Sequence, residues 1–263
     1  MLKLILFGMI IGIANIIPGV SGGTMAVILG VYDKIISAIS NWRTKFIDAV
    51  KLLVPIGVGA VVGIVLFANI IEYTLAAFPM ATNMVFVGLI IGSVPMIYKK
   101  ATAEKIKVSG LLSFLVCFGF MVFMMVVTPS ESSAITTLTL SGFLRIFLSS
   151  AVAAGAMIIP GISGSFVLLL LGLYTTILTA ISDFNILILI PVGLGCAVGI
   201  LGCAKIIERL FAKAPCQTYL GILGFMLGSV PIIFPTISLN IELAISLVLA
   251  AGAAAAAYFF AKE

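Results

Sequence analysis

Two short motifs, PGVSGGT at residues 18–24 and PGISGSF at residues 160–166, place proline, glycine and hydroxyl side chains inside long apolar segments. Proline ends a helix, glycine leaves the backbone accessible, and serine or threonine can cap the helix that follows. The start of that helix would present unpaired N–H groups that suit an anion, phosphate above all. The motifs therefore predict an anion-binding site. Its candidate residues are Pro18, Gly19, Ser21, Gly22, Gly23, Thr24, Gly161, Ser163, Gly164 and Ser165.

Small residues could instead serve close helix packing, which is common in membranes. We expect this packing role at Gly57, Gly59, Gly63, Gly195 and Gly199. For the motif cores we favour a binding site, because packing alone does not require proline, glycine and serine in the same order twice. The second tip should be less open than the first, since Ser165 and Phe166 stand where the first motif has Gly23 and Thr24.

Four polar residues outside the motif cores are further candidates. Asn15 precedes the first turn and could contact substrate or cap backbone; its counterpart is Met157, so either role would be one-sided. Arg145 is the one basic residue that we place on the outer side, where it could capture a phosphate headgroup or lie at the interface as a snorkelling or paired side chain. Glu72 and Glu208 occupy matching positions after a spanning helix and could serve gating, ion coupling or plain ion pairs.

The composition places all these residues in a membrane protein. Of the 263 residues, 63% are hydrophobic and 9% are charged, whereas a soluble domain carries about 25% charged residues. The sequence has no histidine, which removes histidine-based acid–base chemistry, and its four cysteines form no C-x-x-C pair and are expected to fill the core. We predict no catalytic residue, no metal ligand, no cofactor and no nucleic acid partner.

The elements that position the motifs belong to a repeat. Residues 16–35 and 158–177 are identical at ten of twenty positions, residues 55–72 match 191–208, and residues 92–97 match 228–233. The chain is thus expected to form a single transmembrane domain, 1–263, from two repeats, 1–130 and 137–263.

The basic residues indicate that the repeats have opposite orientations. Lysine and arginine gather in the segments 34–51, 99–107 and 205–213, and the matching segment of the other half lacks them each time. Basic loops lie on the cytoplasmic side, so matching loops lie on opposite sides of the membrane. Inverted repeats are typical of secondary transporters, whose site lies near the midplane where the repeats meet.

The apolar segments give the crossings. Six are long enough to span a bilayer: 52–68, 81–98, 109–128, 185–204, 217–234 and 241–261. The motif-bearing stretches 2–40 and 139–182 remain. If each forms a re-entrant hairpin, every basic loop and both termini lie on the cytoplasmic side. A pair of complete, broken helices per motif would place the loops on the same sides. The expected fold is an all-α polytopic membrane protein of two inverted-topology repeats, each with a re-entrant helical hairpin and three transmembrane helices.

The segments GIANIIPGVSGGTMAVILGVYDKI and MIIPGISGSFVLLLLGLY resemble the bacterial polyprenyl-phosphate (undecaprenyl-phosphate) transporter family, and the resemblance covers essentially the whole chain. It implies a multi-pass protein of the bacterial cytoplasmic membrane that returns the lipid carrier undecaprenyl phosphate from the outer to the inner leaflet after cell-wall assembly. It also implies transport without covalent chemistry, with the two motif cores as substrate contacts. A homodimer is compatible with these expectations.

Two other functions use the same features. A secondary transporter of a small anion such as phosphate or sulfate could bind its substrate at the same tips; a closed, water-lined vestibule would favour it, and a lateral opening would favour the lipid. A membrane lipid phosphatase is disfavoured by the absence of histidine. No G-x-x-x-x-G-K-[ST] motif occurs, so a lipid gradient or an ion gradient, such as that of protons, would have to drive transport.

Overall fold

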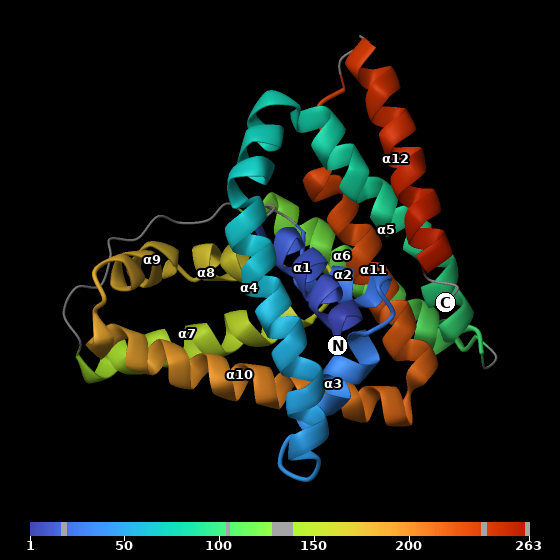
Figure 1. The fold of residues 1–263 in the computed structure, drawn as a ribbon. Helices are drawn as coiled ribbons and strands as arrows, with labels where there is room; N and C mark the ends of the chain where they lie inside the picture. The colour runs from blue at the N-terminus through green and yellow to red at the C-terminus, as the bar shows by residue number, and fades with distance from the viewer. Residues whose placement is uncertain (17–19, 104–105, 128–138, 238–240, 261–263) are drawn as a thin grey trace.

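In this computed structural model of the chain, the residues described are 1–16, 20–103, 106–127, 139–237 and 241–260. Every regular element in that part of the chain is a helix (Figure 1). The helices are α1 (Leu2–Ile16), α2 (Gly22–Ile28), α3 (Tyr32–Ser40), α4 (Phe46–Ala77), α5 (Pro79–Ala101), α6 (Val108–Val126), α7 (Leu140–Ile158), α8 (Gly164–Leu170), α9 (Tyr174–Ser182), α10 (Ile186–Lys213), α11 (Pro215–Ile233) and α12 (Ile241–Phe260).

The helix lengths confirm a polytopic membrane protein. Seven helices, α4, α5, α6, α7, α10, α11 and α12, are long and apolar enough to cross a bilayer. Their outer faces carry large apolar side chains, for example Val65 on α4 and Val116 on α6. Such faces suit lipid, because a helix satisfies its own backbone hydrogen bonds.

Two pairs of short helices follow the motifs and bend sharply. The angle between α2 and α3 is 118°, and that between α8 and α9 is 113°. The two breaks have the same backbone geometry. Gly30 and Gly172 adopt positive φ angles of 68° and 66°. The residue after each glycine donates its N–H to a carbonyl of the preceding helix; at the first break, Val31 donates to Ala26. Glycine ends each short helix because it adopts this left-handed conformation without steric cost.

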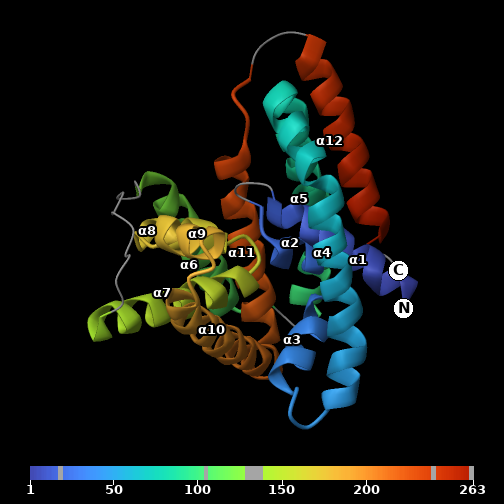
Figure 2. The ribbon, with the colours of Figure 1, turned by 60° about the vertical axis from the view of Figure 1, so that its left-hand side comes forward.

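The helices pack in matching partnerships (Figures 1 and 2). α1 lies along α4, and its counterpart α7 lies along α10. In the same way α5 lies along α12, and its counterpart α11 lies along α6. α5 and α11 meet at the centre. A side chain at Gly59 would overlap the carbonyl of Ile5, and one at Gly199 that of Ala151. The packing role is therefore confirmed there and, in the same way, at Gly63 and Gly195. It is wrong for Gly57, which faces open space.

The two long helices α4 and α10 extend beyond the predicted spans. α4 ends at Ala77 and α10 at Lys213. Glu72 and Glu208 therefore lie within these helices, whereas we expected them to follow the helices. The segments that follow the predicted spans contain no glycine or proline, and each helix stops only before the next proline, Pro79 or Pro215.

Candidate functional site

The first motif forms the start of α2. Ser21 is the N-cap residue, and its hydroxyl accepts a hydrogen bond from the N–H of Gly23 at 3.2 Å. Asn15 caps the same helix from α1: its Oδ1 accepts from the N–H of Gly22 at 3.2 Å, while its Nδ2 donates to the carbonyl of Ile11. Of the two roles that we considered for Asn15, the structure shows the capping of backbone. Pro18 and Gly19 lie outside the described residues.

These contacts correct one expectation about the first tip. The N–H groups of Gly22 and Gly23 are not unpaired, because Asn15 and Ser21 accept from them. Ser21 and Thr24 are also buried, with 2% and 1% of their surfaces exposed. The described part of the first tip, residues 21–24, is therefore largely covered, and the N–H groups of Gly22 and Gly23 have partners.

Over the described residues, 163–166 of the second motif are more open than 21–24 of the first, so the expectation of a less open second tip is wrong there. Ser165 is exposed and Ser163 is half-buried, and their hydroxyl oxygens lie 2.9 Å apart. Gly164 is buried at the start of α8. The difference follows from packing. Each short helix contacts its neighbours in the chain, α1 and α3 for α2, α7 and α9 for α8, but α2 also lies against α5 and α7.

The two motifs touch each other inside the molecule. The N–H of Gly161 donates to the hydroxyl of Thr24 at 2.8 Å, in a buried hydrogen bond between residues 137 positions apart. Gly161 has a φ of 91°. A side chain at Gly23 would come within 2.8 Å of the carbonyl oxygen of Ile158. The predicted meeting of the two motifs is therefore present.

A cavity of about 140 Å³ lies beside this contact. Its lining includes Pro160 of the second motif, Tyr32 of α3, and Gln217, Ile222 and Phe225 of α11. Tyr32 is 4% exposed, and its hydroxyl has no hydrogen-bond partner among the described residues. A buried hydroxyl without a partner is costly unless a ligand or water satisfies it.

Sequence reasoning missed Tyr32, although a signal was present. The apolar stretch after the first motif ends in the tripeptide GVY and that after the second in GLY, so that a tyrosine recurs at residues 32 and 174. Only the first of these two tyrosines is buried.

Arg145 lies away from the tips. Its guanidinium donates to the carbonyl of Leu171 at 3.4 Å, at the break between α8 and α9. The structure does not bring it to Gly161 or Thr24. At the break it lies beside the carboxyl end of a short helix, which favours a cation.

The two glutamates have different surroundings. The carboxylate of Glu208 accepts hydrogen bonds from the side chains of Ser40 and Asn41, which ties α10 to the end of α3. Glu72 is exposed on α4, and no hydrogen bond or ion pair joins it to another described residue. We refer below to Ser40, Asn41 and Glu208 as the α3–α10 latch.

Comparison with known protein families matches residues 11–246 to the VCA0040-like family, which is described as undecaprenyl phosphate translocase-like. The chain belongs to this family. Two curated relatives are each called a polyprenyl-phosphate transporter. The protein from Vibrio cholerae is 32% identical over 242 residues, which cover 87% of this chain and 76% of the relative. The protein from Staphylococcus aureus is 33% identical over 247 residues, covering 90% and 87%. No solved structure matches the chain.

Proposed function

We propose that this protein moves a polyprenyl phosphate, in particular undecaprenyl phosphate, from the outer to the inner leaflet of the bacterial cytoplasmic membrane, without covalent chemistry. The names of the two relatives support a polyprenyl phosphate as substrate. The single observation that carries the proposal is the buried contact of the two motifs, Thr24 with Gly161, beside a cavity that Tyr32 and Pro160 help to line.

The phosphate headgroup would bind where the motifs meet. Ser163 and Ser165 offer accessible hydroxyls. The N–H of Gly161 and the hydroxyl of Thr24 now satisfy each other, and both would turn to phosphate oxygens when the tips separate. Hydrogen bonds to an ionised acceptor are stronger than those between neutral groups, so the exchange favours the bound phosphate. Gly22, Gly23 and Gly164 let the backbones approach, while Asn15 and Ser21 keep the first tip in shape.

The same proposal treats residues 1–130 and 137–263 as inverted repeats whose re-entrant hairpins, within residues 2–40 and 139–182, enter and leave on one side. The matching helix partnerships support this relation, but a few contacts lack a mirror image, one of them extensive. α3 packs on α10, and within the described residues no packing of that extent joins the counterparts α9 and α4. Inverted repeats in unequal conformations are what alternating access requires, since exchange of the two conformations opens the opposite side.

The charges assign a side to this conformation. The α3–α10 latch joins two segments, 34–51 and 205–213, that are rich in lysine and arginine and are therefore assigned to the cytoplasm. We propose that the protein is closed there and open toward the outer leaflet. Arg145, at the break of the more open hairpin, would make the first contact with a phosphate headgroup from that leaflet.

The counterpart of the latch suggests where a coupling ion acts. The repeat aligns Glu72 with Glu208, Ser182 with Ser40, and Asp183 with Asn41. In the exchanged conformation Glu72 would meet Ser182 and a second carboxylate in place of an amide. Two carboxylates at contact distance repel each other unless a proton or another cation lies between them. We propose that this outer gate closes with such an ion, which would couple transport to an ion gradient.

Transport in liposomes tests the proposal. The purified protein should move undecaprenyl phosphate between leaflets faster than in empty liposomes, without releasing trapped inorganic phosphate or sulfate. Release of the small anion without lipid movement would identify the alternative, a small-anion transporter, and movement of neither would overturn both. Imposed proton and sodium gradients test the coupling: a rate that responds to neither gradient would leave the lipid gradient as the driving force.

A further inference from the structure

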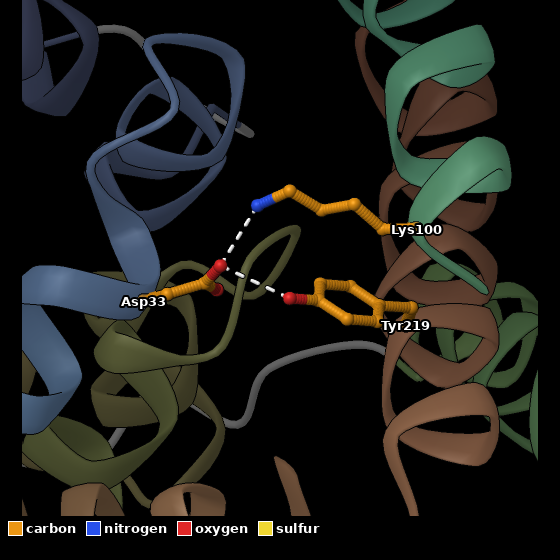
Figure 3. A network of polar contacts seen from close by, with 3 residues as sticks. All are labelled: Asp33, Lys100 and Tyr219. Atoms are coloured by element: carbon orange, nitrogen blue, oxygen red, sulfur yellow. Dashed lines mark hydrogen bonds and ion pairs between the residues drawn. The ribbon is translucent and has the colours of Figure 1, made fainter. Parts of the chain in front are cut away.

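A second polar cluster lies away from the motifs, where three helices approach one another (Figure 3). Asp33 stands in the first turn of α3, Lys100 in the last turn of α5, and Tyr219 near the start of α11. The Nζ of Lys100 lies 2.7 Å from Oδ2 of Asp33, and the hydroxyl of Tyr219 donates to the same oxygen at 3.0 Å. The ammonium group also lies 5.4 Å from the centre of the Tyr219 ring. Two donors thus converge on one anionic oxygen.

The cluster lies on a series of cavities that leads away from the motif contact. The cavity at Pro160 shares Tyr32 and Ile222 with a narrow space of about 10 Å³. That space shares Asp33, Lys100 and Tyr219 with an outer cavity of about 320 Å³. Tyr32 therefore lines both the cavity beside the motif contact and the space beside the cluster. The path ends beside the basic segment 99–107, which the charge pattern assigns to the cytoplasmic side.

We infer that Lys100 and Tyr219 form an anion site for the phosphate headgroup on the cytoplasmic side, and that the carboxylate of Asp33 occupies this site until the phosphate arrives. The inference rests on the proposed function and adds a release site to it. An ammonium and a phenol hydroxyl that bind a carboxylate oxygen can bind a phosphate oxygen with the same geometry. A phosphate monoester carries more negative charge than a carboxylate, so it competes well for the ammonium group.

The cluster has no equivalent in the second half of the chain. The repeat aligns Asp33 with Thr175, Lys100 with Thr236, and Tyr219 with Asn83, and none of these counterparts is charged. A headgroup would therefore meet this site on one side of the membrane only. That asymmetry fits release toward the inner leaflet, because the site holds the phosphate where the lipid leaves.

The cluster could instead be a plain structural contact between α3, α5 and α11. The two roles predict different directions of change in phosphate binding when the cluster residues are mutated. If the ion pair only holds the helices together, removal of either charge weakens the same contact and has the same effect. If Asp33 occupies an anion site, Asp33→Asn frees Lys100 and Tyr219 for phosphate, whereas Lys100→Gln removes the cation that binds it. The two substitutions then have opposite effects on phosphate binding.

The experiment measures binding of farnesyl phosphate, a short isoprenoid monophosphate, to the purified full-length protein in detergent. Asp33→Asn should tighten binding about tenfold and Lys100→Gln should weaken it about tenfold, as expected for a hydrogen bond to a charged group. Tyr219→Phe should weaken binding by a smaller factor. Lys99→Gln is the matched control, because the neighbouring lysine is exposed and lies outside the cluster; it should change binding less than about twofold.

Each outcome decides the inference. Tighter binding by Asp33→Asn cannot result from misfolding, and thermal unfolding of each variant identifies a loss caused by instability. Equal weakening by both substitutions, or no change in either, would overturn the anion site even where the wild-type protein moves undecaprenyl phosphate in liposomes. If the wild-type protein moves no lipid, the proposed function fails. Binding of inorganic phosphate to the same variants then decides the anion site, which opposite effects of Asp33→Asn and Lys100→Gln would still support.

Discussion

A disulfide between positions 40 and 208 should stop lipid transport. The test uses a variant without the four native cysteines that carries Ser40→Cys and Glu208→Cys under mild oxidation, at two positions whose native side chains are in hydrogen-bond contact. The bond would hold α3 on α10 and prevent the exchange of conformations. Transport of undecaprenyl phosphate should fall to the level of empty liposomes and recover when a reductant is added.

The controls for this experiment separate the covalent lock from the loss of two polar side chains. Each single cysteine variant should respond to oxidant no more than the cysteine-free protein does. Glu208→Gln should keep more than about a third of the transport rate, since the amide oxygen still accepts a hydrogen bond and a half-exposed contact contributes little. Normal transport by the fully oxidised double variant would show that α3 and α10 do not need to separate.

Removal of the two hydroxyls from the open tip should also have a large effect. We expect Ser163→Ala with Ser165→Ala to lower transport at least about tenfold, because the charged headgroup loses two hydroxyl donors of its proposed site. The stability of the protein should stay the same, since these hydroxyls bond to each other and Ser165 is exposed. The assay is the transport rate in liposomes, with thermal unfolding in detergent as the measure of folding.

Thr179→Ala is the matched control for the tip, because this hydroxyl lies on the same hairpin, is exposed, and belongs to neither the tip nor the proposed outer gate. It should transport at nearly the wild-type rate. The open tip is the better place for this test than Ser21, whose buried capping bond also stabilises α2. Unchanged transport by the double alanine variant would assign the second motif to helix packing alone.

The features that the sequence predicted correctly depend on local patterns. Long apolar segments predicted membrane-spanning helices, and the small residues Gly59 and Gly199 predicted where pairs of helices approach closely. The recurrence of one motif in both halves predicted a meeting point, and the bond between Thr24 and Gly161 lies there. Each of these inferences needs only residue type and spacing, which a sequence displays directly.

The features that the sequence did not predict depend on which parts of the chain come together. Asn15 accepts from Gly22, seven residues further along the chain, and satisfies an N–H that we expected to be unpaired. The openness of Ser165 depends on which of two similar hairpins packs against the other half, and similar sequences cannot distinguish them. The partners of Glu208 lie more than 160 residues away in the sequence.

The measurement that tests the account most directly is a change of cross-link caused by substrate. Two cysteine-free variants are compared in liposomes, one with Ser40→Cys and Glu208→Cys, the other with Glu72→Cys and Ser182→Cys. Without lipid substrate, the first pair should cross-link and the second should not. Undecaprenyl phosphate should reduce the first cross-link and produce the second, whereas undecaprenol, which lacks the phosphate, should change neither. Transport that proceeds while the pair at positions 72 and 182 never cross-links would contradict the proposed exchange of the two hairpins.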